Sequence, residues 1–390
     1  MLFYTQEVIS VLETFLHWTL KTTNGFFFKN SRYLLFASSP SYSDNSYIVF
    51  NYMLLNNRCN FEFIWLIDDT KIIDEYKGVR FIKKRSLKGL YYFFTSKYIF
   101  HTHGLFFNAN SKDQVVFSLW HGMPLKKIQH MFPKDLKRIA NRNFQFDCSI
   151  ATSPLMQQIV ATCFACPREK VKLTGLPRND YLFRKLRFET IPETSKIIVW
   201  MPTYRNGNNL TEGKQYEYGL PIIDSSNLGL LNEHCAKNNV HLLIKFHPFQ
   251  IKDKEISGFS NIHILSSVHV DPSIHFYNYL GSADALITDY SSVYIDFLAV
   301  DKPIAFILED YEEYSDDRGF VFDDPIKYMP GSHVYNLEEL EAFIQEIGNG
   351  IDSTKILRDT IGVELNQFRD DKNTERFVNE IIPILQKDGK

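Results

Sequence analysis

The sequence has little of what several common protein classes require. Its 390 residues carry a net charge of only −3, so no overall electrostatic attraction to nucleic acid is expected. No apolar run reaches the roughly 18 residues that a membrane-spanning helix needs. The five cysteines are an odd number without a secretory signal pattern, which favours a reducing compartment over a disulfide framework.

Metal-binding motifs are also missing. Cys163 and Cys166 form a C-x-x-C on a predicted helix, but nothing completes a zinc set, so two ordinary helix cysteines are expected. No two aspartates are separated by a single residue, so the Asp-x-Asp metal site of many nucleotide-sugar transferases is absent. We therefore predict no metal and no other cofactor. Phosphate charge on a substrate would be met by basic side chains, hydroxyl groups and a helix N-terminus.

Short apolar runs alternate with helical patterns through most of the chain, which is 44% hydrophobic. This alternation predicts parallel sheets with crossover helices, and two series of runs predict two doubly wound, Rossmann-like α/β domains. The break is expected within Leu186–Ser195, giving domains 1–190 and 191–390. The predicted strands of the first series are Tyr33–Ser38, Phe61–Ile67, Val79–Lys83, Tyr98–His101, Val115–Leu119, Cys148–Thr152 and Val171–Thr174. Those of the second are Ile197–Met201, His241–Phe246, Ile262–Leu265, Ala285–Thr288 and Ile304–Leu308, followed by helical patterns over Leu337–Leu385.

Two segments are candidates for contact with a membrane surface. The N-terminal segment is predicted to form an amphipathic helix, which either packs on its own domain or lies on a membrane. Its apolar residues are Val8, Val11, Leu12, Phe15, Leu16 and Leu20. The other segment is a basic stretch, for which a solvated helix is the alternative. Its basic residues are Lys126, Lys127, Lys134, Lys137, Arg138 and Arg142.

Histidines follow two of the predicted strands directly. The substrate of a doubly wound domain lies beyond the C-terminal ends of its strands, so such residues are candidates for chemistry. His121 is followed by Gly122, which favours a turn, and an imidazole there accepts a proton from an attacking hydroxyl near neutral pH. A hydrogen-bonded structural histidine is the alternative. His247 precedes Pro248 and shares a strand face with Lys245, and this cationic pair suits a phosphate, although a solvated strand edge is the alternative.

Further candidates for phosphate binding also follow strands. Asp289 ends a strand, and Ser291 and Ser292 then open a helical pattern. Free N–H groups and hydroxyls at a helix start make an anion site, although helix capping alone is the alternative. Thr203 and Arg205 follow another strand, although a surface ion pair is the alternative for Arg205.

Two loops supply the remaining candidates. Arg318 lies in a loop that contains a glycine. A guanidinium binds phosphate oxygens through two parallel hydrogen bonds, although a surface ion pair is the alternative. A turn after another strand holds Arg178, Asn179 and Asp180, which either contact an acceptor or form a structural interdomain turn.

Taken together, these segments resemble the CDP-glycerol glycerophosphotransferase family, the teichoic-acid primase and polymerase type. The family carries Trp-His-Gly-Thr-Pro, Gly-Tyr-Pro-Arg-Asn-Asp, Pro-Thr-Trp-Arg, His-Pro, Thr-Asp-Tyr-Ser-Ser, Asp-Lys-Pro, Glu-Glu-Tyr and Arg-Gly-Phe. The corresponding segments, in the same order, are Trp120–Pro124, Gly175–Asp180, Pro202–Arg205, His247-Pro248, Thr288–Ser292, Asp301–Pro303, Glu312–Tyr314 and Arg318–Phe320. Ser41–Asn45 also resembles a family element. Met123, Leu176 and Tyr204 depart from the pattern, which leaves the acceptor open.

The resemblance implies a GT-B fold, in which two Rossmann-like domains face a cleft. It implies transfer of a polyol phosphate from a CDP-polyol donor, with release of CMP. Glycerol phosphate from CDP-glycerol is expected, and ribitol phosphate from CDP-ribitol is the alternative. His121 and His247 would be the catalytic histidines, and Arg318, Ser291 and Ser292 would match donor-phosphate ligands. We predict that Thr203, Arg205, Lys245, Pro248 and Asp289 complete the donor site.

The acceptor that the resemblance implies is a hydroxyl of a cell-surface polymer or its lipid-linked precursor. The enzyme is therefore expected in the cytoplasm, attached peripherally to the anionic inner face of the cell membrane. A GT-B glycosyltransferase that uses a nucleotide sugar is the first alternative. A non-catalytic scaffold protein of a polymer-synthesis complex is the second, although histidines at two strand ends argue against it.

Overall fold

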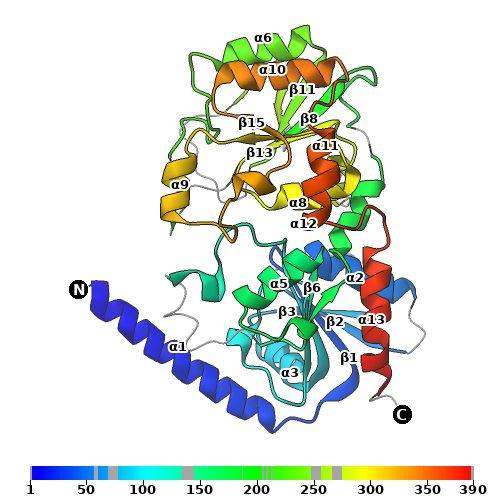
Figure 1. Ribbon diagram of the computed structural model, residues 1–390. Helices are drawn as coiled ribbons and strands as arrows, with labels where there is room; N and C mark the ends of the chain where they lie inside the picture. Colours follow the sequence, from blue (N-terminus) through cyan, green and yellow to red (C-terminus); the bar gives the residue numbers. More distant parts are fainter. Residues whose placement is uncertain are drawn as a thin grey trace. The chain divides into compact units, whose positions relative to one another are not determined.

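The structure is a computed structural model of the chain. It describes residues 2–56, 60–68, 78–133, 145–186, 188–203, 206–207, 210–211, 214–246, 256–265 and 275–387. The chain divides into two compact units, shown in Figure 1. The first comprises Met1–Met123, Ile128–Arg178 and Lys372–Lys390, and the second comprises Pro124–Lys127 and Asn179–Asp371.

The first unit is built on a parallel sheet of seven strands in the order β3-β2-β1-β4-β5-β6-β7. Its strands are β1 (Asn30–Ala37), β2 (Glu62–Ile67), β3 (Val79–Lys83), β4 (Ser96–His101), β5 (Val115–Ser118), β6 (Cys148–Ala151) and β7 (Val171–Leu173). Its helices are α1 (Leu2–Gly25), α2 (Asp44–Leu55), α3 (Leu87–Thr95), α5 (Pro154–Cys163) and α13 (Asn373–Lys387), with 3₁₀ turns η2 (Phe106–Asn108), η3 (Gln129–Met131) and η4 (Arg168–Lys170). The strand order reverses direction between β1 and β4, which marks the switch point where doubly wound sheets bind ligands.

The second unit repeats this design with a six-stranded parallel sheet in the order β12-β11-β8-β13-β14-β15. Its strands are β8 (Lys196–Met201), β11 (Val240–Ile244), β12 (Ile262–Ile264), β13 (Ala285–Thr288), β14 (Ile304–Ile307) and β15 (Ser332–Val334), beside a small hairpin of β9 (Asn206–Gly207) and β10 (Leu210–Thr211). Its helical segments are α6 (Leu228–Lys237), α7 (Phe276–Leu280), α8 (Val293–Phe297), η7 (Leu298–Val300), α9 (Tyr311–Asp317), η8 (Ile326–Tyr328), α10 (Leu337–Gly348), α11 (Lys355–Leu357), η9 (Arg358–Gly362) and α12 (Val363–Leu365). The 3₁₀ segment η5 (Pro177–Phe183) begins in the first unit and ends in the second. The strand order 3-2-1-4-5-6 is that of the dinucleotide-binding fold, with its switch point between β8 and β13.

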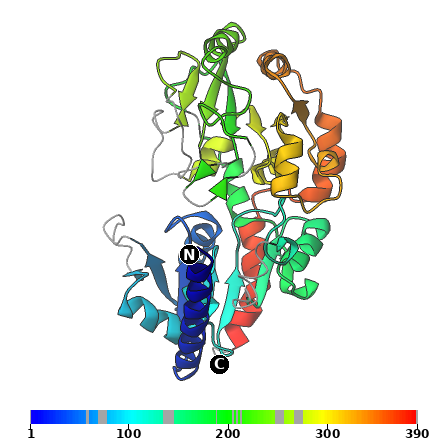
Figure 2. The same cartoon turned by 90° about the vertical axis from the view of Figure 1, so that its left-hand side faces the viewer.

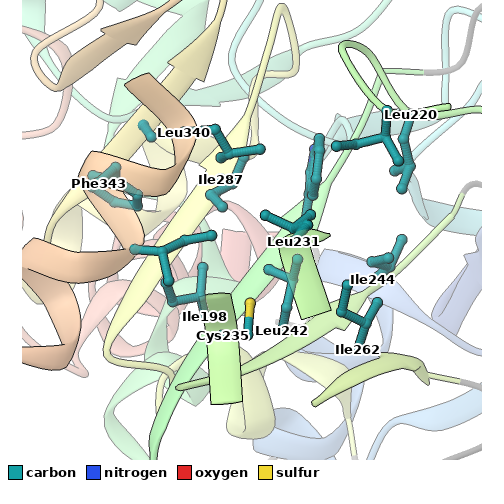
Figure 3. Packing of buried hydrophobic residues seen from close by; sticks show 14 of the residues in the cluster. Ile198, Leu220, Leu231, Cys235, Leu242, Ile244, Ile262, Ile287, Leu340 and Phe343 are labelled. Atoms are coloured by element: carbon teal, nitrogen blue, oxygen red, sulfur yellow. The ribbon is translucent and has the colours of Figure 1, made fainter. Parts of the chain in front are cut away.

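Helices α6 and α10 cover one face of this second sheet (Figure 1). Figure 3 shows the core that they bury, in which apolar side chains of the strands and of the two helices interdigitate. The labelled members are Ile198, Leu220, Leu231, Cys235, Leu242, Ile244, Ile262, Ile287, Leu340 and Phe343. Helix α10 begins where the Asn336 side chain accepts a hydrogen bond from the Glu339 N–H at 3.0 Å, a standard N-cap.

All twelve strands predicted from the sequence are present, with ends that differ by three residues or fewer. Strand β15 and the β9–β10 hairpin were not predicted, because β9 and β10 are two residues long and β15 contains one apolar residue. The division into units also differs from the expected boundary. It falls between Arg178 and Asn179, and the closing helix α13 belongs to the first unit. There Phe377 of α13 is buried beside Phe117 of β5, with the ring centroids 6.2 Å apart.

Helix α1 lies on the outside of the first unit (Figure 2), as an amphipathic helix would. Its described inner side is anchored by polar contacts: His17 Nδ1 lies 2.8 Å from the Phe107 carbonyl oxygen, and the Asn24 amide donates to the Ala109 carbonyl at 2.9 Å. The apolar side chains of Leu12, Phe15 and Trp18 are 57–63% exposed. Helix α1 therefore has an apolar outer surface that its own unit leaves uncovered. Among the described residues, no helix is both long and apolar enough to span a membrane.

Candidate active site

The candidate site of the first unit lies at the carboxyl ends of β4 and β5. These strands are parallel neighbours, with His101 opposite Ser118, so the residues that follow them emerge at the same edge of the sheet. The Leu119 N–H donates to the His101 carbonyl at 2.8 Å, which continues the pairing by one residue. Trp120 then has φ = 47° and Gly122 has φ = 134°. The second value is one that residues with a Cβ rarely adopt, so Gly122 allows the turn that holds His121 at the sheet edge.

Asn45, at the start of α2, fixes this turn. Its amide donates to the carbonyl oxygens of Leu119 at 3.0 Å and Trp120 at 3.1 Å, and its side-chain oxygen accepts from the Arg178 N–H at 2.9 Å. The neighbouring Asp44 carboxylate accepts from the Arg178 guanidinium at 3.1 Å. Arg178, predicted as an acceptor contact or a structural residue, is thus part of the buried frame behind His121. The sequence had marked Ser41–Asn45 as a family element without giving it this role.

The neutral imidazole of His121 is held in one tautomer. Its Nδ1 lies 3.2 Å from the Thr102 carbonyl oxygen, which accepts hydrogen bonds but cannot donate them, so the neutral ring carries its proton on Nδ1. The Nε2 lone pair is then the one that accepts a proton. Burial lowers the pKa of His121, and the Arg178 guanidinium lowers it further, while Asp44 and the Thr102 hydrogen bond act in the opposite direction. A neutral imidazole is what a general base near neutral pH requires.

A second histidine, missed by the sequence reasoning, lies against His121. The imidazole of His103 stacks on that of His121 with ring centroids 3.9 Å apart and an interplanar angle of 6°. The alternation of His101, Thr102 and His103 at the end of a strand was visible in the sequence. It was not selected, because none of the quoted family motifs contains His103 and its stacking partner follows another strand.

In the second unit, a buried polar pair lies at the switch point. Asp289, directly after β13, is fully buried, and its Oδ1 accepts from the Thr203 N–H at 2.8 Å and from the Thr203 hydroxyl. Thr203 follows β8, the strand next to β13. Both residues were predicted for the donor site. The structure brings them together where a doubly wound sheet binds its ligand.

Ser291 and Ser292 lie just beyond Asp289, as predicted for the start of a helix. Both side chains are half-buried. Ser292 is the residue before α8, and its hydroxyl makes no capping hydrogen bond to that helix. The alternative of simple capping therefore does not account for Ser292. Helix α8 is only five residues long before it tightens into η7, so its dipole adds little to any anion site here.

Lys245 and Arg318 are the two described cationic candidates of this unit. Lys245 follows β11; its pKa is lowered by burial, and its ammonium lies 4.9 Å from the centre of the Phe276 ring. Arg318 closes α9, and Gly319 follows at φ = 70°, where an added Cβ would lie 3.3 Å from the Lys127 side chain. The Gly319 carbonyl accepts from the Lys127 N–H at 3.1 Å. The loop of Arg318 is thus bound to the short segment Pro124–Lys127.

The remaining predicted site residues lie outside the described parts of the chain or are buried in η5. His247, Pro248 and Arg205 lie outside the described residues, as do Lys134, Lys137, Arg138 and Arg142 of the basic stretch. Asn179 and Asp180 are buried in η5. Cys163 is buried at the end of α5, as expected for an ordinary helix cysteine. Among the residues that the structure describes, no three His, Cys, Asp or Glu side chains are grouped so that they could hold a metal.

Comparison with known proteins identifies the family. The family model described as CDP-Glycerol:Poly(glycerophosphate) glycerophosphotransferase matches residues 19–383. The chain belongs to this family. It is therefore a glycerophosphotransferase of the CDP-glycerol type, and the enzyme class predicted from its motifs is confirmed.

Individual relatives agree with this assignment. The chain is 28% identical over 349 residues to a teichoic acid poly(glycerol phosphate) polymerase of Bacillus spizizenii, a match that covers 82% of this chain and 85% of the relative. It is 27% identical over 347 residues to a teichoic acid glycerol-phosphate transferase of Staphylococcus aureus, covering 82% and 84%. A solved structure of the wall teichoic acid polymerase TagF matches with a TM-score of 0.74 at 19% identity, over 99% of this chain and 97% of that one. The predicted GT-B fold class, with two doubly wound units, is confirmed by this match.

Proposed function

We propose that this glycerophosphotransferase moves glycerol phosphate from CDP-glycerol to a terminal hydroxyl of a teichoic-acid-type polymer or its lipid-linked precursor. The observation that carries the proposal is His121, a neutral imidazole whose Nδ1 is occupied by the Thr102 carbonyl and whose Nε2 is left to accept a proton. Glycerol is favoured over ribitol because the matching family model is described by glycerophosphate chemistry and the two relatives named above, 28% and 27% identical, are glycerol-phosphate enzymes. Ribitol-phosphate relatives also match: a primase is 24% identical over 56% of this chain, and a polymerase is 26% identical over 82%.

In the proposed reaction, the acceptor hydroxyl gives its proton to His121 as its oxygen attacks the phosphorus that bears the glycerol. A new P–O bond forms in line with the P–O bond that breaks, and CMP leaves with the electron pair of that bond. The proton on His121 then passes to solvent. Positioning and electrostatics do most of the work in phosphoryl transfer, and no covalent intermediate with the enzyme is needed.

We assign the donor to the second unit. The Thr203–Asp289 pair marks its switch point, and Ser291, Ser292 and Lys245 follow strands at the same edge of that sheet. Arg318, held by the pairing of Gly319 with Lys127, would neutralise phosphate charge. His247, Pro248 and Arg205 keep their proposed places in the donor site.

The decisive experiment offers purified protein a panel of donors together with a glycerol-phosphate-primed acceptor. We expect CMP release from CDP-glycerol, matched by new phosphodiester signals in ³¹P NMR spectra. A preference for CDP-ribitol would replace the proposed polyol. UDP release from a nucleotide sugar would establish the glycosyltransferase alternative, and no release from any donor would support the scaffold.

We further propose that the enzyme acts on the cytoplasmic side of the membrane, attached through α1. The support is the outer surface of α1, where Leu12, Phe15 and Trp18 are exposed, continued by Phe26 and Phe28 at 85% and 87% exposure. Large apolar side chains grouped in this way mark an interaction surface, and aromatic rings suit the boundary of a bilayer. The described part of the basic stretch gives less support, since Lys126 packs over the Tyr314 ring at 5.2 Å.

In vesicle flotation, the protein should float with vesicles that contain anionic lipid. Replacing Phe15 and Trp18 together by serine should weaken partitioning by at least ~100-fold, because burying each large apolar side chain contributes about 1.5–3 kcal/mol. The matched control is Leu230→Ser on α6, which removes a side chain of similar exposure, 56%, from the second unit. Equal flotation of the double variant and the control would remove α1 from the attachment.

A further inference from the structure

The stacked imidazoles of His103 and His121 form a unit organised by one residue, Thr102. Its carbonyl oxygen lies 3.2 Å from His121 Nδ1, and its hydroxyl lies 2.8 Å from His103 Nδ1. Thr102 is itself fully buried. Both rings therefore have their Nδ1 atoms fixed by the same residue, and the parallel stacking at 3.9 Å follows from this shared anchor.

His103 is the outer member of the pair. Its side chain remains exposed to solvent, whereas His121 is half-buried. One face of the His121 ring is covered by His103, and the ring also contacts the indole of Trp120, with centroids 4.1 Å apart. His103 consequently shields one face of the His121 imidazole from water.

The surroundings oppose a second positive charge on the pair. Partial desolvation and the adjacent His121 lower the pKa of His103, and burial lowers the pKa of His121. Burial lowers the pKa of the neighbouring His101 to about 4. The titratable and charged groups that face the pair are Asp44, Lys84, His101 and Arg178. Asp44 is the anion among them, and it is hydrogen-bonded to Arg178.

We propose that His103 is a positioning residue for His121: its ring fixes the plane of the His121 imidazole and shields it from water, so that His121 stays neutral with Nε2 ready to accept a proton. This inference rests on the proposed role of His121 as the base. It assigns to the family's reaction a residue that none of the predicted motifs contains. Because the surroundings oppose a second positive charge, the stacked pair can take up one added proton. This is the proton that His121 accepts in the reaction.

Two variants distinguish the effect of the flat ring of His103 from the effect of its nitrogen atoms. His103→Ala removes the stacked ring, so water reaches His121 and its pKa should rise. The acid limb of the kcat/KM profile should then move to higher pH, and kcat should fall ~10- to 100-fold, as expected for a misplaced catalytic group. KM for CDP-glycerol should stay within about twofold, since a base contributes little to ground-state binding. His103→Phe keeps a flat ring, so it should keep the acid limb and lose only a few-fold in kcat.

The control is His234→Ala in the second unit, which removes a half-buried histidine that contacts the Glu341 carbonyl. It should leave kcat and the acid limb unchanged. An unmoved acid limb in His103→Ala, or an equal shift in His103→Phe, would overturn the proposal. Thermal melts should show all three variants folded; if His103→Ala does not fold, the Phe variant is compared with the native protein by NMR.

A second measurement distinguishes failure of this inference from failure of the proposed function. In ¹⁵N-histidine-labelled protein, the imidazole nitrogen shifts of His121 report its tautomer and pKa without any substrate. In the native protein we expect Nδ1 protonated and Nε2 bare, with a pKa below that of a free histidine. That pattern should persist in His103→Phe and be lost in His103→Ala. Unchanged imidazole nitrogen shifts of His121 in His103→Ala would rule out the positioning role, even if the enzyme were fully active.

Discussion

Replacing His121 by alanine should lower kcat for CMP release roughly 10²- to 10⁴-fold, the range expected when a positioned general base is lost. The fold should survive, because His121 is half-buried at a sheet edge and its one hydrogen bond is to the Thr102 carbonyl, which water can satisfy. The loss should appear equally in kcat and in kcat/KM for the donor, as for an interaction made in the transition state.

The pH profile of the native enzyme should report the same residue. Burial lowers the pKa of His121, so its neutral form persists to lower pH than that of an exposed histidine. Activity should hold as the pH falls below 6.5 and decline only where this lowered pKa is crossed. The matched control is His130→Ala, which removes an exposed imidazole from η3 in the same unit. Native-like turnover in His121→Ala would take His121 out of the mechanism.

Strand positions, and therefore the edges at which the candidate residues lie, were predictable from the sequence. Each of the runs ending near His121, Thr203 and Asp289 is a short, continuous apolar stretch, as expected of a strand buried on both faces in a parallel sheet. The rule that ligands lie beyond the carboxyl ends of such strands then selects the residues that follow them. This reasoning is local, and it succeeds because it needs only the chain near each residue.

Pairings between distant segments could not be predicted in the same way. The bond between Asp289 and Thr203 joins residues 86 apart, and the stacking of His103 on His121 depends on which strands are neighbours. The placement of α13 shows the same limit. Its apolar periodicity indicates that one face is buried, but not that Phe377 packs beside Phe117 in the first sheet. These contacts depend on the order of the strands in the sheets, and no single segment of the sequence determines that order.

Asn45 provides the sharpest test of whether the frame behind His121 matters for catalysis. Its amide group is the donor to both carbonyls of the His121 turn, at Leu119 and Trp120, while its oxygen accepts from the Arg178 N–H. The side chain is fully buried. Asn45→Asp keeps the size and the acceptor but replaces the two N–H donors by an oxygen that faces two carbonyl oxygens. That contact is repulsive, so the turn must shift.

We expect Asn45→Asp to lower kcat on the order of 100-fold, because a shift of about 1 Å in a catalytic group costs that much. KM for CDP-glycerol should change little, since the donor is assigned to the second unit. Thermal stability should also fall, because the buried Leu119 carbonyl loses its partner at a cost of about 1–3 kcal/mol, and the part-buried Trp120 carbonyl loses the same partner. The matched control is Asn232→Asp on α6, whose amide makes a long, exposed contact of 3.4 Å to the Ser260 hydroxyl. It should leave kcat unchanged. Activity measured well below the melting temperature of each variant separates catalysis from unfolding, and a folded Asn45→Asp enzyme with native kcat would show that the turn holds His121 in place without this amide.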